Sequence, residues 1–300
     1  MDITADSINF HELGEFKHFL EEMDLIGSAQ LEEPILDNSG NVLIKEGVNV
    51  KPSAISRLEQ MAGHYQPKFK ITVGKDLIRA ISAYLTPIVI KRLKAPRNDF
   101  ILYLFEQTPL RYRSYIDAAL RTHAQVLLLL YKTSRLTPEF FNHVCDLGLL
   151  SMGLAMTAEA HERFIFRYSF LSGIMADMAL KDSDDWKDID IDFQKRKRLN
   201  ARSADFSADY DLAEEMLDAI ANHALDFNRP HYETFKLSES AESTEETEDQ
   251  VVDEEPHISA AQRDMNRALL TEVLRLARYI YETSRRISDA EHFAEELVYM

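Results

Sequence analysis

Cysteine is almost absent from this chain of 300 residues, in which Cys145 is the single example. One cysteine cannot form an intrachain disulfide, and such usage is typical of proteins from a reducing compartment. Cys145 lies inside the apolar run FFNHVCDLGLLSMGLAM, so we expect a buried and inert thiol. The sequence therefore predicts a cytoplasmic protein without disulfides.

Long hydrophobic runs are missing as well. The longest strongly apolar run, Val126–Tyr131, is far shorter than the ~20 residues that a helix needs to span a bilayer. The N-terminal segment MDITADSINFHELGEF is acidic and lacks the basic and apolar regions of a signal peptide. We therefore predict no membrane insertion.

Positive charge is scarce. Lysine and arginine number 34 against 51 aspartates and glutamates, and the net charge is −17. This balance argues against nucleic-acid binding, which relies on lysine and arginine to displace counterions from phosphates. Nine of the acids lie in residues 237–256, without which the net charge would be −8. We predict that this acidic segment is a disordered loop. It is either simply solvated or a docking segment for a basic partner.

The first 72 residues indicate a small α+β module. The segment PILDNSGNVLIKEGVNV, at 34–50, alternates in polarity and predicts two strands joined by a tight turn. The following segment, AISRLEQMAG, predicts a helix that Ser53 caps and that ends at Gly63. A two-stranded hairpin is marginal alone, so we expect it to pack against the rest of the chain.

From residue 74 the pattern is helical, with apolar residues at spacings of three and four. Pro96, Pro109 and Pro138 fall between these runs, where breaks are expected, and Thr137-Pro138-Glu139 is typical of a helix start. The later helices are expected at about 139–156, 158–180, 209–225 and 258–287. The predicted fold class is mainly α, with an α+β module at 1–72 and a helical domain at 73–300.

One lone acid distinguishes the segment GIMADMAL, Gly173–Leu180. Asp177 lies in a segment that is apolar nearly all round, and a buried carboxylate is costly unless a cation or hydrogen-bond donors meet it. His143 lies 34 residues upstream and His223 lies 46 residues downstream. A carboxylate between two distant histidines suggests a metal site, either functional or vestigial.

This order and spacing resemble the HD-GYP subgroup of the HD-domain metal-dependent phosphohydrolases. His143 matches the first metal-binding histidine of that family, and GIMADMAL matches its signature helix, which has a pattern like ALLHDIGK. Asp177 corresponds to the family aspartate and His223 to one histidine of a later pattern like HHE. The strand–turn–strand–helix pattern at 34–63 is similar to a small module that often precedes HD-GYP domains. The resemblance implies an HD-domain-like helical bundle.

Several ligand positions of that family are substituted in this chain. Ala176 replaces the histidine of the signature, and Asn222 replaces the other histidine of the later pair. No counterpart of a further single histidine is found between residues 178 and 222, and no GYP triplet follows His223. Arg278 stands where the family has a late aspartate, which places a positive charge at a ligand position. The resemblance therefore implies that His143, Asp177 and His223 are vestigial and would hold at most one divalent metal (Fe, Mn or Zn).

Each surviving residue also has a simpler interpretation. His143 can be a helix histidine satisfied by a carboxylate, and Asp177 can be hydrogen-bonded to His143 or paired with Arg278, a salt bridge in place of the metal. His223, near a helix end, is more often exposed or a capping residue. The basic run Lys195–Arg198 follows the acidic segment 182–193 and pairs with it, faces water or meets phosphates.

These observations predict a catalytically inactive HD-GYP-like signalling or adaptor protein. It would need no cofactor and act through protein partners, with a cyclic dinucleotide as a candidate ligand. The alternative is an atypical metal-dependent cyclic di-GMP phosphodiesterase. The long C-terminal helix fits a homodimer or ordinary core packing equally well.

Overall fold

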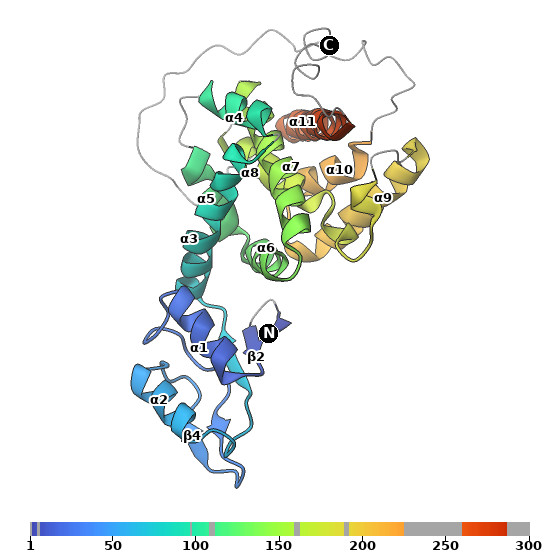
Figure 1. Cartoon of the computed structure of the whole chain (residues 1–300). Coiled ribbons are helices and arrows are strands. Elements are labelled where there is room, and N and C mark those ends of the chain that lie inside the picture. The colour runs from blue at the N-terminus through green and yellow to red at the C-terminus, as the bar shows by residue number, and fades with distance from the viewer. Residues whose placement is uncertain are drawn as a thin grey trace, which may run out of the picture.

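The structure is a computed structural model that describes residues 2–4, 7–96, 98–107, 112–158, 163–188, 192–224 and 260–286. It is mostly helical, as predicted, and carries a small N-terminal module of strands and two helices (Figure 1). The acidic segment 237–256 lies outside the described residues. Among the described helices, none combines the length and the apolar character that crossing a membrane requires.

The N-terminal module contains two small antiparallel sheets. The first has the order β1-β2-β5, with β2 and β5 joined in register from Ser7 opposite Thr72 to Phe10 opposite Phe69. The second pairs β3 with β4, which confirms the hairpin predicted within 34–50. The strand bounds are β1 Asp2–Ile3, β2 Ser7–Phe10, β3 Ile35–Leu36, β4 Val42–Ile44 and β5 Phe69–Thr72. The three-stranded sheet was not predicted.

Asp37 organises the hairpin turn. Its Oδ1 accepts hydrogen bonds from the backbone N–H groups of Ser39 and Asn41, both at 2.8 Å. Gly40 follows with φ +83°, a left-handed conformation that glycine adopts without steric cost. This local chemistry accounts for the position of the turn.

The module's two helices are α1, Leu13–Glu22, and α2, Pro52–Gln60. The prediction that Ser53 caps α2 is wrong. Lys51 occupies the N-cap position without a side-chain bond, and Pro52 is the first helical residue. Proline starts a helix well because its φ is already helical and it has no N–H to leave unpaired.

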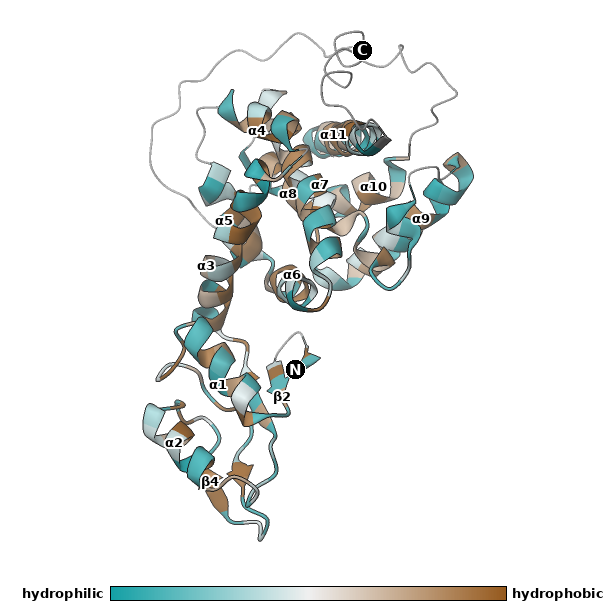
Figure 2. Ribbon diagram, viewed as in Figure 1, coloured by the Kyte–Doolittle hydropathy of each residue, from teal (hydrophilic) through white to brown (hydrophobic). Residues whose placement is uncertain are grey.

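The helical body packs around α7 and α8, whose residues are buried on nearly all sides. Figure 2 shows α9 at the edge of the molecule, where it is largely polar. The bounds are α3 Lys75–Lys91, α4 Asp99–Glu106, α5 Tyr112–Thr122, α6 Ala124–Leu136, α7 Pro138–Thr157, α8 Arg163–Met175, α9 Phe193–Ser207, α10 Glu214–Asn222 and α11 Ala260–Arg286. Four short 3-10 turns, η1 Arg92–Lys94, η2 Met178–Leu180, η3 Asp185–Lys187 and η4 Ala208–Tyr210, connect them.

Two glycines let α7 and α8 approach each other closely. A Cβ atom placed on Gly173 would lie 2.7 Å from the Cα of Gly148 and 2.8 Å from the backbone oxygen of Leu147. A Cβ on Gly148 would lie 2.9 Å from the backbone oxygen of Phe170. Because backbone cannot move aside cheaply, this crossing requires glycine on both helices.

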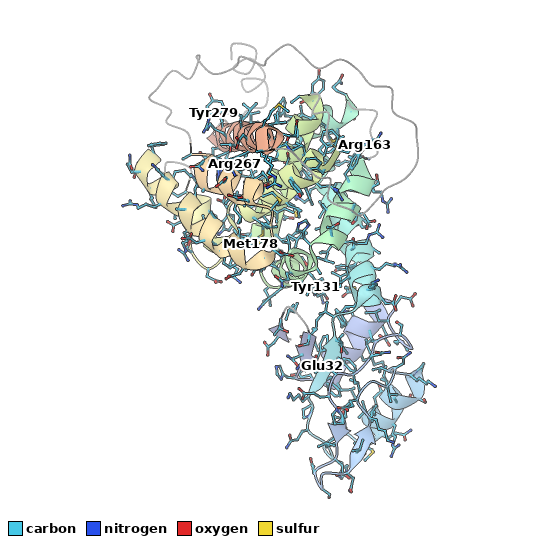
Figure 3. The ribbon with its side chains drawn as sticks, turned by 180° about the vertical axis from the view of Figure 1, so that it is seen from behind. Glu32, Tyr131, Arg163, Met178, Arg267 and Tyr279 are labelled. Carbon is cyan, nitrogen blue, oxygen red and sulfur yellow. The ribbon has the colours of Figure 1, made fainter. Side chains whose placement is uncertain are left out.

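The module and the body share one continuous apolar core. The ring of Phe19 on α1 meets that of Tyr131 on α6 edge-on, with centroids 5.9 Å apart, and Tyr131 meets Tyr84 on α3 in the same way. Figure 3 places Tyr131 at the junction of the two parts. Arg135 on α6 also donates to Glu22 at 3.1 Å. The predicted boundary after residue 72 falls between β5 and α3.

Three helix predictions need correction. The α8 helix ends at Met175, so Asp177 lies in a turn rather than inside a helix, consistent with the low helix propensity of aspartate. The segment predicted as one helix at 209–225 is instead η4 and α10, separated by Asp211 at φ +52°. The α9 helix was missed, because its buried face is mainly polar.

Candidate functional site: a buried ion-pair network

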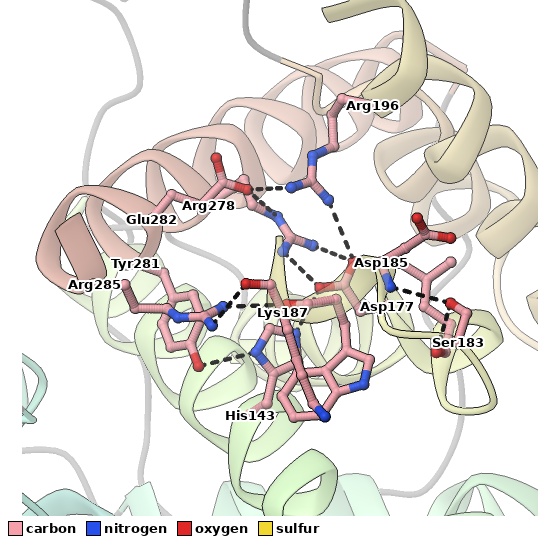
Figure 4. A network of polar contacts seen from close by, with 12 residues as sticks. His143, Asp177, Ser183, Asp185, Lys187, Arg196, Arg278, Tyr281, Glu282 and Arg285 are labelled. Carbon is pink, nitrogen blue, oxygen red and sulfur yellow. Dashed lines mark hydrogen bonds and ion pairs between the residues drawn. The ribbon is translucent and has the colours of Figure 1, made fainter. Parts of the chain in front are cut away.

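The candidate site is a set of charged side chains buried between helices that are distant in sequence (Figure 4). The α7 helix contributes His143, the turn after α8 contributes Asp177, and α9 contributes Arg196. The α11 helix contributes Arg278 and Glu282. All five are buried, with at most 6% of each residue exposed. Such a concentration of buried charge is stable only when the charges are mutually paired.

Asp177 and Arg278 form the centre of the network. Both guanidinium Nη atoms of Arg278 donate to Asp177, one to each carboxylate oxygen, at 2.6 Å. This confirms the predicted salt bridge between the two residues. The fork of the guanidinium matches the two oxygens of the carboxylate, which is the strongest geometry available to such a pair.

The two partners shift each other's protonation equilibria. Burial alone would raise the pKa of Asp177, but Arg278 and His143 outweigh it and hold that pKa well below its usual range. Burial alone would lower the pKa of Arg278, and Asp177 reverses this, so the pKa rises. Both residues are therefore charged across the physiological pH range, as a closed ion pair.

His143 bridges Asp177 and Tyr281. Its Nε2 lies 2.7 Å from Asp177 Oδ2, and its Nδ1 lies 2.9 Å from the Tyr281 hydroxyl. Burial lowers the pKa of His143 despite the carboxylate beside it, so the ring is neutral. An ionised carboxylate only accepts hydrogen bonds, so Nε2 carries the proton and Nδ1 accepts from Tyr281. Burial also raises the pKa of Tyr281, which keeps that hydroxyl protonated as a donor.

Arg196 on α9 and Glu282 on α11 lie beside the pair of Asp177 and Arg278. Arg196 Nη2 donates to Glu282 Oε1 at 2.6 Å, and Arg196 Nη1 lies 3.9 Å from Asp177 Oδ1. Arg278 Nε lies 3.8 Å from the same Glu282 oxygen. Two carboxylates thus face two guanidinium groups, and the network is neutral as a whole. In the sequence, Arg196 is visible only as one member of the basic run Lys195–Arg198.

The other predicted site residues lie around this network. Ala176 is buried beside Asp177, with 1% exposed, and Asn222 is exposed at the end of α10 with its Nδ2 donating to the Asp218 backbone oxygen. His223 is fully buried, so the expectation of an exposed residue is wrong, although it does occupy the C-cap position of α10. Its Nδ1 donates to the Ile220 backbone oxygen at 2.8 Å. Burial lowers the pKa of His223 to about 3, and Arg278 acts in the same direction.

A partly buried ion pair joins Asp146 on α7, one turn after His143, to Arg92 in η1. Arg92 donates to both oxygens of Asp146, at 2.8 and 2.6 Å, and Asn98 Nδ2 donates to Asp146 at 2.9 Å. Lys195, the first member of the basic run, lies outside the ion-pair network. Lys195 pairs with Asp185 at 3.0 Å, which confirms its predicted pairing with the acidic segment.

Acid is expected to destabilise the fold through the two neutral histidines. Their pKa values are lowered in the native state, so below about pH 6.5 the unfolded chain takes up protons that the native chain does not, and stability falls as pH falls. For His223 alone, the loss between pH 7 and pH 5 is about 2 kcal/mol, and His143 adds to it in the same direction. Urea unfolding at these two pH values measures the effect.

The matched variants for this measurement are His223→Gln and His18→Gln. His18 is exposed on α1, so its replacement should leave the pH dependence of stability intact, whereas His223→Gln should flatten it. Equal stability of the unsubstituted protein at pH 7 and pH 5 would contradict the prediction.

The side chains of the network have few free ligand atoms for a metal ion. Both oxygens of Asp177 already accept from Arg278, and the Nε2 of His143 carries a proton. Within the described ranges, no three His, Cys, Asp or Glu side chains gather into a group suited to a metal. The predictions about cofactors and catalysis stay predictions.

Comparisons with protein-family models, with curated proteins and with solved structures give no match to this chain.

Proposed function

We propose that this chain is a non-catalytic signalling or adaptor protein, built on an HD-GYP-like helical scaffold in which Arg278 replaces the metal at Asp177. The bidentate pair between these two residues is the observation that supports the proposal most directly. A guanidinium supplies the positive charge that a buried carboxylate needs, but it cannot lower the pKa of a water molecule as a metal ion does. The site then serves to hold α7, α9 and α11 together.

Exposed apolar side chains on the outer face of α11 support a role in protein contacts. Met265 and Leu276 are exposed, with 53% and 37% of each residue accessible. They are eleven residues apart, which places them on the same face of the helix, three turns apart. Such apolar side chains are suited to packing against a partner protein.

Purified protein is expected to contain no stoichiometric metal, even when it is produced with added manganese or iron. It is also expected to leave cyclic di-GMP intact at millimolar Mn²⁺. Elemental analysis and chromatographic product detection measure these two quantities, and an active HD-GYP enzyme provides the positive control. An unchanged melting temperature in the presence of Mn²⁺ would agree, because a ligand that binds only the native state raises it.

Two iron or manganese ions per chain, together with turnover that chelation abolishes, would overturn the proposal. That result would support the alternative, an atypical metal-dependent phosphodiesterase. Protein partners are tested separately by crosslinking in cells, comparing the unsubstituted chain with a Met265→Lys/Leu276→Lys variant of α11.

A further inference from the structure

A separate pocket of about 360 Å³ lies where the first strand of the module meets the helical body. Strand β1 and the residue after it provide one wall through Ile3 and Thr4. The α6 helix provides the floor through Leu128 and Leu129. The segment around η2 and the end of α9 close the other sides, and Figure 3 shows Met178 of η2 above Tyr131, near this junction. None of the residues of the ion-pair network lines it.

Two lysines and one aspartate, Asp209, line this pocket, so its net charge is positive. Lys132 on α6 and Lys181 just after η2 both line it, and both are half-buried. Over the described part of the chain neither makes a salt bridge, whereas Lys17, Lys70 and Lys195 all pair with acids on the surface. The charge of Lys132 does contribute, after His11, to the lowered pKa of Asp2 on β1. Two half-buried ammonium groups without a salt-bridge partner at one cavity favour an anionic ligand, phosphate above all.

Two aromatic rings also line the pocket. Phe206 on α9 and Tyr210 in η4 lie with ring centroids 5.0 Å apart and are both half-buried. Burial, and then the charge of Asp209, raise the pKa of Tyr210, so its hydroxyl stays protonated and can donate. With the leucines of the floor, these rings offer an apolar surface on which a planar group can pack.

We propose that this pocket binds a nucleoside monophosphate. The phosphate would lie against Lys132 and Lys181, the base against Phe206 and Tyr210, and a sugar hydroxyl would donate to Asp209 at the rim. The volume is near the lower end of the range for small-molecule sites, which run from about 300 to 1,000 Å³. It suits one ring and one phosphate rather than a cyclic dinucleotide. The inference is independent of the function proposed for the ion-pair network.

A ligand in this position would contact the N-terminal module and the body at once. The walls come from β1 on one side and from α6, α9 and the segment after η2 on the other. Since a bound molecule stabilises the arrangement that forms its site, it would hold the module against the helical body. Ligand binding would then be a way to regulate the contacts that the module makes.

The test is titration calorimetry of the full chain with AMP, GMP, CMP and UMP, each beside its nucleoside and beside inorganic phosphate. At least one nucleotide is expected to bind with a dissociation constant below about 1 mM. Lys132→Met/Lys181→Met is expected to weaken that binding at least about tenfold. Lys197→Met, an exposed lysine of α9 outside the pocket, is expected to bind as the unsubstituted chain does.

Tyr210→Leu provides the second arm, because it removes a ring without changing the charge. It is expected to weaken nucleotide binding while leaving any interaction with inorganic phosphate unchanged. The absence of heat with all four nucleotides would overturn the inference, as would equal binding by the double lysine variant. Inorganic phosphate binding as tightly as the nucleotides would also overturn it. Circular dichroism of each variant establishes that a loss of binding is not a loss of fold.

Discussion

Asp177→Asn is expected to lower the free energy of unfolding by about 3–5 kcal/mol, the usual cost of removing one partner of a buried ion pair. Asparagine has nearly the same shape, so the packing of the site changes little. The substitution removes the charge that meets Arg278 at both oxygens and that accepts the Nε2–H of His143. Arg278 would then be a buried cation, and Glu282, 3.8 Å from its Nε, already accepts from Arg196. Urea unfolding at pH 7.5 measures the loss.

Two further variants separate the charge from the packing. Asp184→Asn is the matched control, because Asp184 is exposed and pairs with Lys187 on the surface, where such pairs contribute little. Asp177→Asn/Arg278→Met is expected to regain a large part of the lost stability, since no unpaired charge is left at this position. A loss below about 1 kcal/mol for the single variant would show that the network does not stabilise the fold.

Gly173→Ala is expected to lower the free energy of unfolding by about 3 kcal/mol, at the upper end for overpacking of a core. The added methyl group would overlap the Cα of Gly148 and the backbone oxygen of Leu147, and neither can move without shifting α7. Displacing α7 against α8 would also move His143 relative to Asp177. Thermal or chemical unfolding measures the stability, and the His143 ring signals in an NMR spectrum report the displacement.

Gly14→Ala is the matched control for that substitution. Gly14 also lies in a helix, α1, but a Cβ placed there meets nothing within 4 Å. Alanine is the better helix former, so this variant is expected to gain about 0.5–1 kcal/mol. Opposite signs for the two glycine variants are the diagnostic result. An unchanged free energy of unfolding for Gly173→Ala would contradict the close contact between α7 and α8.

Apolar periodicity predicted the parts of the fold whose buried faces are apolar. The α7 and α11 helices were expected within about two residues of their observed bounds, and the hairpin turn at Asn38–Asn41 followed from turn-forming residues. The sheet of β1, β2 and β5 was missed because its strands are very short and separated by up to 58 residues. Pairing over such a distance leaves no local pattern.

The α9 helix shows a different reason for failure. Its buried face consists largely of Arg196, Asn200, Ser203 and Ser207, which recur with helical spacing. A search for apolar periodicity cannot detect a helix whose inner face is polar. Arg196 was also missed as a residue of the candidate site. Its partner, Glu282, is 86 residues away, so no local pattern connects the two. Spacing of buried polar residues at i, i+4, i+7 and i+11 is the signal that would have found it.

The pair of Asp177 and Arg278 was predicted only through the resemblance to a family whose ligand positions are known. Composition and spacing alone do not indicate which distant cation meets a lone buried acid. The burial of His223 was missed for a related reason, since a histidine at a helix end is exposed or buried according to what packs over it. In this chain that environment includes Arg196 and Arg278, from α9 and α11.

The chain order of the network has a consequence for biosynthesis. Asp177 leaves the ribosome 101 residues before Arg278, and His143 leaves 138 residues before Tyr281. Because domains tend to fold as units during synthesis, the nascent helical body must hold Asp177 without its bidentate partner until α11 emerges. The last described helix therefore completes the tertiary structure, and translation that stops before it would yield a chain unable to mature.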